Sequence, residues 1–212
     1  MKRILFQGDS ITDCGRNRDD IANLGGGYPK LVGSHLGYDF PNDYNFVNKG
    51  ISGNRIVDVY ARIKADIINL KPDYMSILIG VNDVWHEVAF SNGVDIVKFE
   101  KIYTMLFEEI LEALPDIKIM VLEPFVIQGT ATVDNEQIPD KWAKFCKVKD
   151  YAKVARKIAG KFGFAFVELQ DKFDAACERC ENAHWSGDGV HPTNAGHELI
   201  ARAWLEKFEE IK

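Results

Sequence analysis

The stretch RILFQGDS at residues 3–10 contains the pattern from which the fold is predicted. A short run with an apolar centre, Ile4-Leu5-Phe6, leads into Gly8-Asp9-Ser10, a polar sequence typical of a turn. Similar runs recur along the chain, and near-continuous apolar runs are typical of strands whose two faces are both covered by helices. We therefore predict a parallel sheet of five strands, at Arg3–Gln7, Asn45–Asn48, Tyr74–Ile79, Lys118–Leu122 and Ala165–Glu168.

Amphipathic stretches separate these runs and indicate helices between the strands. The predicted helices are Pro29–Leu36, Arg55–Asn69, Val97–Leu114, Pro139–Phe162, Asp171–Cys180 and Thr193–Phe208. Strands that alternate with helices are typical of an α/β fold built from βα units. The segment Pro124–Ile138 has no clear period, so we expect a loop over the carboxyl-terminal edge of the sheet, where such folds place ligands.

Length and composition are those of a globular protein. A chain of 212 residues with 46% hydrophobic and 27% charged residues is sufficient for one hydrophobic core, so we expect residues 1–212 to form a single domain. The net charge of −6, without any basic block, argues against nucleic acid or an acidic membrane surface as a partner.

The sequence also predicts where the protein works. No segment approaches the length of a membrane span, and the apolar run after Lys2-Arg3 is too short for a signal peptide. The chain has four cysteines and no Asn-x-Ser/Thr sequon, which favours a reducing compartment. We therefore expect a cytoplasmic protein.

Four polar blocks stand at positions that the predicted fold brings together. Three of them follow the first three strands, and the fourth precedes the last helix; they are Gly8–Ser10, Gly50–Asn54, Gly80–Asp83 and Asp188–Pro192. In a parallel sheet these strand ends lie at one edge. Each block alone is common as a turn or a helix cap, but all four in order indicate a site.

The residue types in these blocks are those that acyl transfer needs. A serine hydroxyl is a poor nucleophile unless a base is adjacent, and His191 can activate Ser10. Asp188, three residues before His191, is close enough to orient the imidazole. The developing oxyanion needs preorganised donors, for which the backbone N–H groups of Ser10 and Gly53 and the side-chain amide of Asn82 are candidates.

With these four blocks the sequence resembles the SGNH hydrolase superfamily, also called GDSL esterases and lipases. The resemblance implies a flavodoxin-like three-layer α/β/α sandwich with Ser10, Asp188 and His191 as triad and Ser10, Gly53 and Asn82 as oxyanion hole. The Gly-x-Ser-x-Gly sequence of α/β-hydrolases is absent around Ser10. Residues that flank the blocks are similar to intracellular serine acetylxylan esterases, which implies removal of O-acetyl groups from acetylated xylo-oligosaccharides or related sugars.

Two tryptophans stand near the blocks. Trp85 follows the Asn82 block and Trp185 precedes Asp188, so their rings could bind an acyl group or stack on a sugar. The alternative is ordinary packing at the edge of the sheet. We expect no metal or organic cofactor, because no histidine has metal-ligand spacing and Cys177-x-x-Cys180 lacks a second pair.

Other functions remain open at this point. The same triad would serve a lysophospholipase or an acyl-CoA thioesterase, and the same scaffold could carry a ligand-binding protein without catalysis. The acyl chain length, the acetyl position and the assembly state are not determined by the sequence. An exposed sheet edge and the loop Pro124–Ile138 are surfaces on which a homo-oligomer could form, as the family resemblance suggests.

Overall fold

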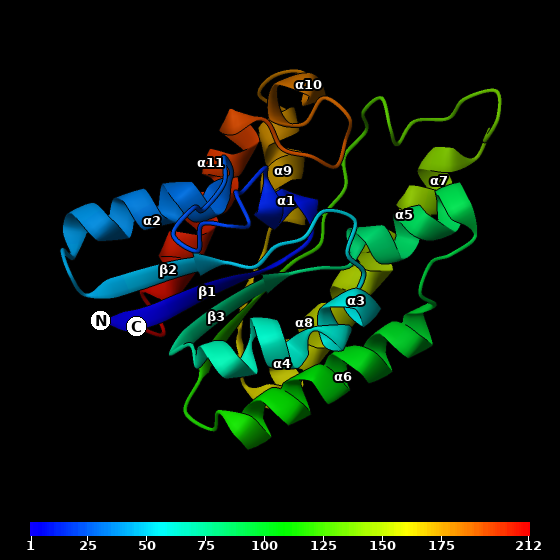
Figure 1. Ribbon diagram of the computed structural model, residues 1–212. Coiled ribbons are helices and arrows are strands. Elements are labelled where there is room, and N and C mark those ends of the chain that lie inside the picture. Colours follow the sequence, from blue (N-terminus) through cyan, green and yellow to red (C-terminus); the bar gives the residue numbers. More distant parts are fainter.

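The computed structural model, which describes residues 1–212, contains a sheet of five parallel strands in the order β2-β1-β3-β4-β5 (Figure 1). The strands are β1 Lys2–Gly8, β2 Tyr44–Asn48, β3 Tyr74–Leu78, β4 Lys118–Leu122 and β5 Ala165–Val167. All five lie at predicted positions, with ends that differ by a single residue where they differ at all. The predicted parallel sheet is therefore confirmed.

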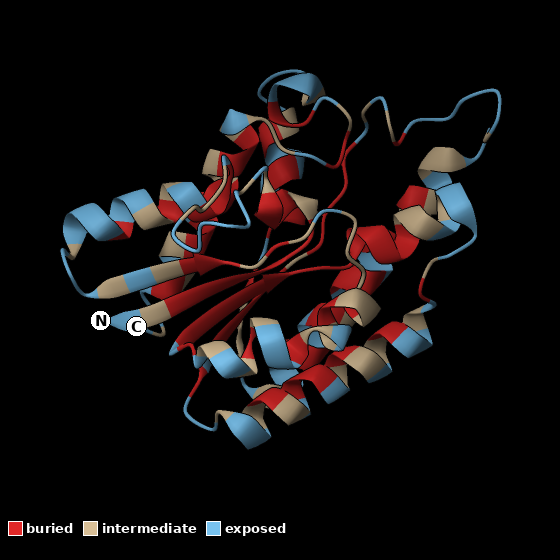
Figure 2. Cartoon of the chain, viewed as in Figure 1, coloured by how far each residue is buried: buried red, intermediate tan, exposed pale blue.

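Helices cover both faces of the sheet and complete the three-layer sandwich (Figure 1). One layer contains α2 (Tyr28–Asp39), α9 (Gln170–Cys177) and α11 (Asn194–Phe208). The other contains α3 (Ile56–Ala61), α4 (Ile63–Asp66), α6 (Ile96–Ala113) and α8 (Val148–Phe162). The strands between the two layers are buried along most of their length (Figure 2), as the apolar runs predicted. No helix is long and apolar enough to cross a membrane.

Two long predicted helices are wrong in their continuity. The predicted helix Arg55–Asn69 is divided into α3, α4 and a 3-10 turn, η1 (Ile68–Leu70), with a break at Arg62. The backbone of Arg62 leaves the helical region at φ −113° and ψ 15°, where its side chain is hydrogen-bonded to other segments. Tertiary contacts have overridden helical propensity at this residue.

The predicted helix Pro139–Phe162 is likewise two helices, α7 (Lys141–Phe145) and α8. Phe145 at the end of α7 packs its ring against Trp85, at a centroid distance of 5.6 Å, whereas α8 packs on α6 and the sheet. The two helices therefore face different neighbours, and the chain turns between them.

Three helices were not predicted at all. They are α1 (Ser10–Asp13), α5 (Val81–Phe90) and α10 (Asn182–Trp185). The most important is α5, whose first residues coincide with a polar block and therefore have the composition of a turn. The segment Pro124–Ile138 contains neither helix nor strand, so the predicted loop is confirmed.

Candidate active site

Ser10 is the first residue of α1 and follows β1 after the single residue Asp9, the N-cap of that helix. Its Oγ is 2.8 Å from Nε2 of His191, and Nδ1 of the same ring is 2.6 Å from Oδ2 of Asp188. An ionised carboxylate can only accept a hydrogen bond, so the ring proton belongs on Nδ1. Nε2 is then free to accept the hydroxyl proton of Ser10.

The turn that contains Asp188 and His191 is held by its own backbone. Oδ1 of Asp188 accepts hydrogen bonds from the N–H groups of Val190 at 2.9 Å and His191 at 2.7 Å. Ser186, which the sequence analysis did not single out, places its Oγ 3.2 Å from the same oxygen and 2.9 Å from the carbonyl oxygen of His191. The carboxylate is therefore fixed in position on both of its oxygens.

The loop between β4 and α7 braces this turn from the other side. The N–H groups of Ile127, Thr130 and Ala131 donate to the carbonyl oxygens of Gly189, Gly187 and Asp188. The loop lies in the segment Pro124–Ile138, which the sequence analysis predicted to cover the carboxyl-terminal edge of the sheet. Its backbone hydrogen bonds hold residues 187–189 in place, so the loop has a structural role in positioning Asp188.

The electrostatics of the pair follow from these contacts. Burial opposes ionisation of Asp188, but the hydrogen bonds from the His191 ring and from the backbone outweigh burial and lower its pKa to about 2. The hydrogen bond to Asp188 in turn raises the pKa of His191, against the opposing effect of burial. Asp188 thus stays charged at neutral pH and stabilises an imidazolium at His191.

Besides Ser10, the oxyanion-donor candidates Gly53 and Asn82 lie on two further segments. Gly53 has φ +80°, a left-handed conformation that suits glycine, in the loop after β2. A Cβ at Gly50 in the same loop would collide with the backbone N of Asp13, so this loop packs directly on α1. Asn82, in the first turn of α5, is buried, and its Nδ2 donates to the carbonyl oxygen of Asn54 at 3.2 Å.

A cleft of about 490 Å³ opens at the nucleophile. Ser10 and His191 line it together with Asp13, Arg16, Arg18 and Ser52, and only one of its eight lining residues is hydrophobic. Arg18 pairs with Asp13 at 3.2 Å, while Arg16 donates from Nε to the carbonyl oxygen of Gly50 at 2.9 Å. The cleft therefore offers hydrogen-bond donors and charge to whatever binds beside Ser10.

Neither arginine was predicted as a site residue. Arg16 and Arg18 follow the serine block closely in sequence, and their charge and proximity to Ser10 were the only available signals. Whether they point into the cleft depends on the turn after α1, where Cys14 adopts a left-handed conformation at φ 38°.

Two further carboxyl groups, those of Asp9 and Asp83, accept hydrogen bonds from backbone N–H groups. Oδ1 of Asp9 accepts from the N–H of Ile11 at 3.0 Å, and Asp83 accepts from the N–H of Ile56 at 3.1 Å. Oδ2 of Asp9 is buried without a hydrogen-bond partner. Burial raises the pKa of Asp9 to about 7 and that of Asp83 well above its ordinary value.

The two tryptophans are in different environments. The Trp85 ring is half-buried, with its centroid 5.7 Å from that of His191. Trp185 is only 8% exposed and belongs to the hydrophobic core, so its contacts are those of the packing alternative. Burial of Trp185 depends on α10 and the start of α11, which no local pattern around residue 185 indicates.

No group of three or more His, Cys, Asp or Glu side chains is arranged to hold a metal ion, and all four cysteines are free. The remaining buried histidine, His197, accepts the N–H of Tyr28 on Nδ1 at 3.2 Å and lies 3.4 Å from Sγ of Cys14. Burial lowers its pKa to about 4. His197 is thus a neutral packing residue beside the site.

Known proteins share this architecture over the whole chain. The model of the GDSL-like lipase/acylhydrolase family matches residues 6–199. The acetylxylan esterase of Geobacillus stearothermophilus is 36% identical over 224 residues, covering 100% of this chain and 96% of that protein. Its crystal structure superposes with a TM-score of 0.84 and 35% identity, covering 97% of this chain and 93% of that chain.

A second solved structure is equally similar. A candidate GDSL-like lipase from Parabacteroides merdae has a TM-score of 0.87 and 34% identity, covering 98% of this chain and 95% of that chain. These matches confirm the resemblance that the four polar blocks indicated. The chain belongs to the GDSL-like lipase/acylhydrolase family and is a carboxylic ester hydrolase.

Proposed function

We propose that this protein is a serine esterase that removes O-acetyl groups from acetylated xylo-oligosaccharides or related sugars. The observation that carries the proposal is the line of contacts from Ser10 Oγ to His191 Nε2 at 2.8 Å and from His191 Nδ1 to Asp188 at 2.6 Å. It supplies a nucleophile, a base and an orienting carboxylate in hydrogen-bond contact.

The reaction proceeds through an acetyl-enzyme. Ser10 Oγ attacks the ester carbonyl carbon while its proton passes to Nε2 of His191. The oxyanion is stabilised by the N–H groups of Ser10 and Gly53 and by the amide of Asn82. When the tetrahedral intermediate collapses, His191 returns the proton to the sugar oxygen, which leaves as a hydroxyl group and leaves the acetyl group on Ser10.

Water completes the cycle on the same groups. His191 takes a proton from the water molecule that attacks the acetyl-enzyme, and the second tetrahedral intermediate collapses to acetate as the proton returns to Ser10 Oγ. Asp188 keeps the ring oriented through both halves and remains ionised throughout. Two catalytic mutants of the Geobacillus stearothermophilus acetylxylan esterase are known from crystal structures. In one a serine and in the other an aspartate is replaced by alanine, and serine and aspartate are also residue types of the proposed triad.

The polar cleft supports a sugar ester over a long-chain ester. Only one of the eight residues that line it is hydrophobic, whereas a lysophospholipase or long-chain thioesterase needs an apolar channel for its acyl chain. Trp85 is the one aromatic ring in contact with His191, so we propose it as the surface against which the acetyl group or a pyranose face packs.

Hydrolysis of p-nitrophenyl acetate by the wild type and by Ser10→Ala tests the chemistry. We expect kcat to fall by about 10⁴-fold or more in the variant, with unchanged circular dichroism and thermal unfolding. Wild-type protein without esterase activity would favour the ligand-binding alternative. Activity that persists in Ser10→Ala would identify another nucleophile.

A substrate panel at equal concentration tests the specificity. Acetylated xylo-oligosaccharides, other acetylated sugars, an acyl-CoA and a lysophospholipid would be compared by kcat/KM. We expect the acetylated oligosaccharides to be the best substrates, and a rate that rises from acetate to octanoate esters would contradict the deacetylase proposal.

A further inference from the structure

Arg62 is a largely buried arginine outside the candidate catalytic residues. It occupies the break between α3 and α4, and its side chain is 14% exposed. It does not line the cleft at Ser10. Its position beneath the strand ends nevertheless places it next to the segments that carry the oxyanion donors.

All three guanidinium nitrogens of Arg62 are engaged. Nη2 donates to Oε1 of Gln7 at 2.6 Å and to the carbonyl oxygen of Gly8 at 3.3 Å, at the end of β1. Nη1 donates to the carbonyl oxygen of Lys49 at 2.7 Å, just after β2. These acceptors are neutral, so the contacts fix geometry more than they compensate charge.

The two remaining contacts have different purposes. Nε donates to Oδ1 of Asn54 at 2.9 Å, whereas Nη1 forms an ion pair with Asp66 at 2.9 Å, one helical turn along α4. The ion pair balances the buried charge of Arg62. The bond to Asn54 ties the guanidinium to the loop that contains Gly53.

Through these contacts one rigid group reaches all three donors. Gly8 is two residues before Ser10, and Asn54 directly follows Gly53. The carbonyl oxygen of Asn54 also accepts the hydrogen bond from Nδ2 of Asn82 at 3.2 Å. The relative positions of the N–H groups of Ser10 and Gly53 and of the Asn82 amide therefore depend on segments that Arg62 holds together.

We propose that Arg62 is a positioning residue of the oxyanion hole, which sets the spacing of the three donors without contacting the substrate. This inference rests on the proposed esterase function. The planar fork of an arginine binds several oxygens at fixed angles, which the single ammonium of lysine does not reproduce. Donors displaced by a fraction of an ångström stabilise the oxyanion less well, so the cost falls on the chemical step.

The test compares Arg62→Lys with Asp66→Asn, which removes the charged partner and leaves the neutral contacts of Arg62 in place. On p-nitrophenyl acetate we expect Arg62→Lys to lower kcat by about 10- to 100-fold with little change in KM. Asp66→Asn is expected to reduce thermal stability but to keep kcat near the wild-type value. Equal losses of kcat in the two variants would assign Arg62 to the ion pair alone.

A double-mutant cycle with Asn82→Ala supplies the decisive readout. If Arg62 acts through the donors, the double variant loses much less than the product of the two single losses, because the donor array is already impaired in Asn82→Ala. A loss of kcat equal to that product would overturn the proposal. Should Arg62→Lys fail to fold, Asn54→Ala, which removes only the Nε contact, takes its place in the same cycle.

The result is separable from the proposed function. A wild type that hydrolyses acetate esters, and loses this activity in Ser10→Ala, upholds the esterase whatever Arg62 does. An active wild type with an unimpaired Arg62→Lys variant refutes the positioning role alone.

Discussion

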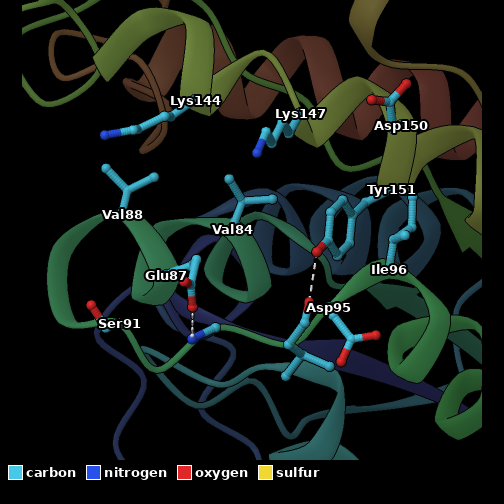
Figure 3. Close-up of a pocket in the computed structure, with 12 residues that line it drawn as sticks. Val84, Glu87, Val88, Ser91, Asp95, Ile96, Lys144, Lys147, Asp150 and Tyr151 are labelled. Atoms are coloured by element: carbon cyan, nitrogen blue, oxygen red, sulfur yellow. Dashed lines mark hydrogen bonds between the residues drawn. The ribbon is translucent and has the colours of Figure 1, made fainter. Parts of the chain in front are cut away.

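Two hollows in this molecule differ in size and in chemistry. The cleft at Ser10 has a volume of about 490 Å³, and a second cavity of about 850 Å³ lies between α5 and the α7–α8 segment (Figure 3). In the larger cavity, Val84 and Val88 on α5 face Lys144 and Lys147 across the gap. Two hydrogen bonds join residues that line it: the hydroxyl of Tyr151 donates to the carbonyl oxygen of Val94 at 2.6 Å, and the N–H of Gly93 donates to Oε2 of Glu87 at 3.1 Å (Figure 3).

The comparison shows that the volume of a cavity does not identify the catalytic site. The larger cavity contains a serine, Ser91, but no histidine lines it, and a serine without a base is a weak nucleophile. The smaller cleft combines Ser10 with His191 and lies beside the loop that contains Gly53. Substitutions in the two hollows should therefore differ by orders of magnitude in their effect on catalysis.

After Ser10→Ala, the largest expected effect is that of Asp188→Asn in the cleft. An amide at this position can donate to Nδ1, which places the ring proton on Nε2 and prevents His191 from accepting the proton of Ser10. We expect kcat on p-nitrophenyl acetate to fall by about 10⁴-fold while the fold is kept. A loss below about tenfold would show that another group orients His191.

Asn82→Ala should have the next largest effect. Loss of one oxyanion donor is expected to lower kcat by about 10²- to 10³-fold, since such a donor contributes about 3–4 kcal/mol to the transition state. KM should change little, because the interaction forms mainly in the transition state. A raised KM with unchanged kcat would place Asn82 in ground-state binding instead.

Asp9, the buried carboxyl group next to Ser10 in the sequence, should affect the stability of the protein. The folded pKa of Asp9 is about 7, above the ordinary 3.8, so between these values the unfolded chain loses a proton that the folded chain retains. The stability of the wild type should therefore fall as pH rises from 4 to 7, relative to Asp9→Asn, by up to about 4 kcal/mol. Urea unfolding of both proteins at several pH values measures this difference, and parallel profiles would contradict it.

The pH dependence of catalysis gives a smaller and more diagnostic effect. Only the neutral His191 ring accepts the proton of Ser10, and the hydrogen bond to Asp188 raises the pKa of His191 above its ordinary value. The acid limb of kcat/KM should therefore have its midpoint above about pH 6.5, and kcat/KM should approach a tenfold loss per pH unit below that midpoint. A wild-type rate that is independent of pH from 5 to 8 would exclude His191 as the base.

Sequence patterns predicted the parts of this molecule that depend on local signals. The strands ended where polar turns follow apolar runs, and the spacing of Asp188 to His191 is short enough to bring them together in any fold. That Ser10 and His191 lie close together could be predicted only from the parallel sheet, whose strand ends meet at one edge. Here local pattern and global fold agree.

The parts that failed depend on tertiary contacts. The helix break at Arg62 is accompanied by hydrogen bonds to residues up to 55 positions away, which no periodicity records. The helix α5 begins inside a polar block, so its first residues have the composition of a turn and gave no helical signal. These are positions where packing overrides the local preference of the chain.

The smallest effect should come from the larger cavity. Lys147 is exposed and Ser91 ends α5 with φ 51°, a conformation that glycine adopts more readily than serine. Because neither residue touches the cleft, Lys147→Ala and Ser91→Gly should leave kcat/KM within about twofold of the wild type, the range expected for surface substitutions. Assays of both variants on p-nitrophenyl acetate and on acetylated xylo-oligosaccharides complete the comparison. If either variant lost activity on the oligosaccharide alone, the larger cavity would be a binding site for the distal part of the substrate, and the two hollows would belong to one functional surface.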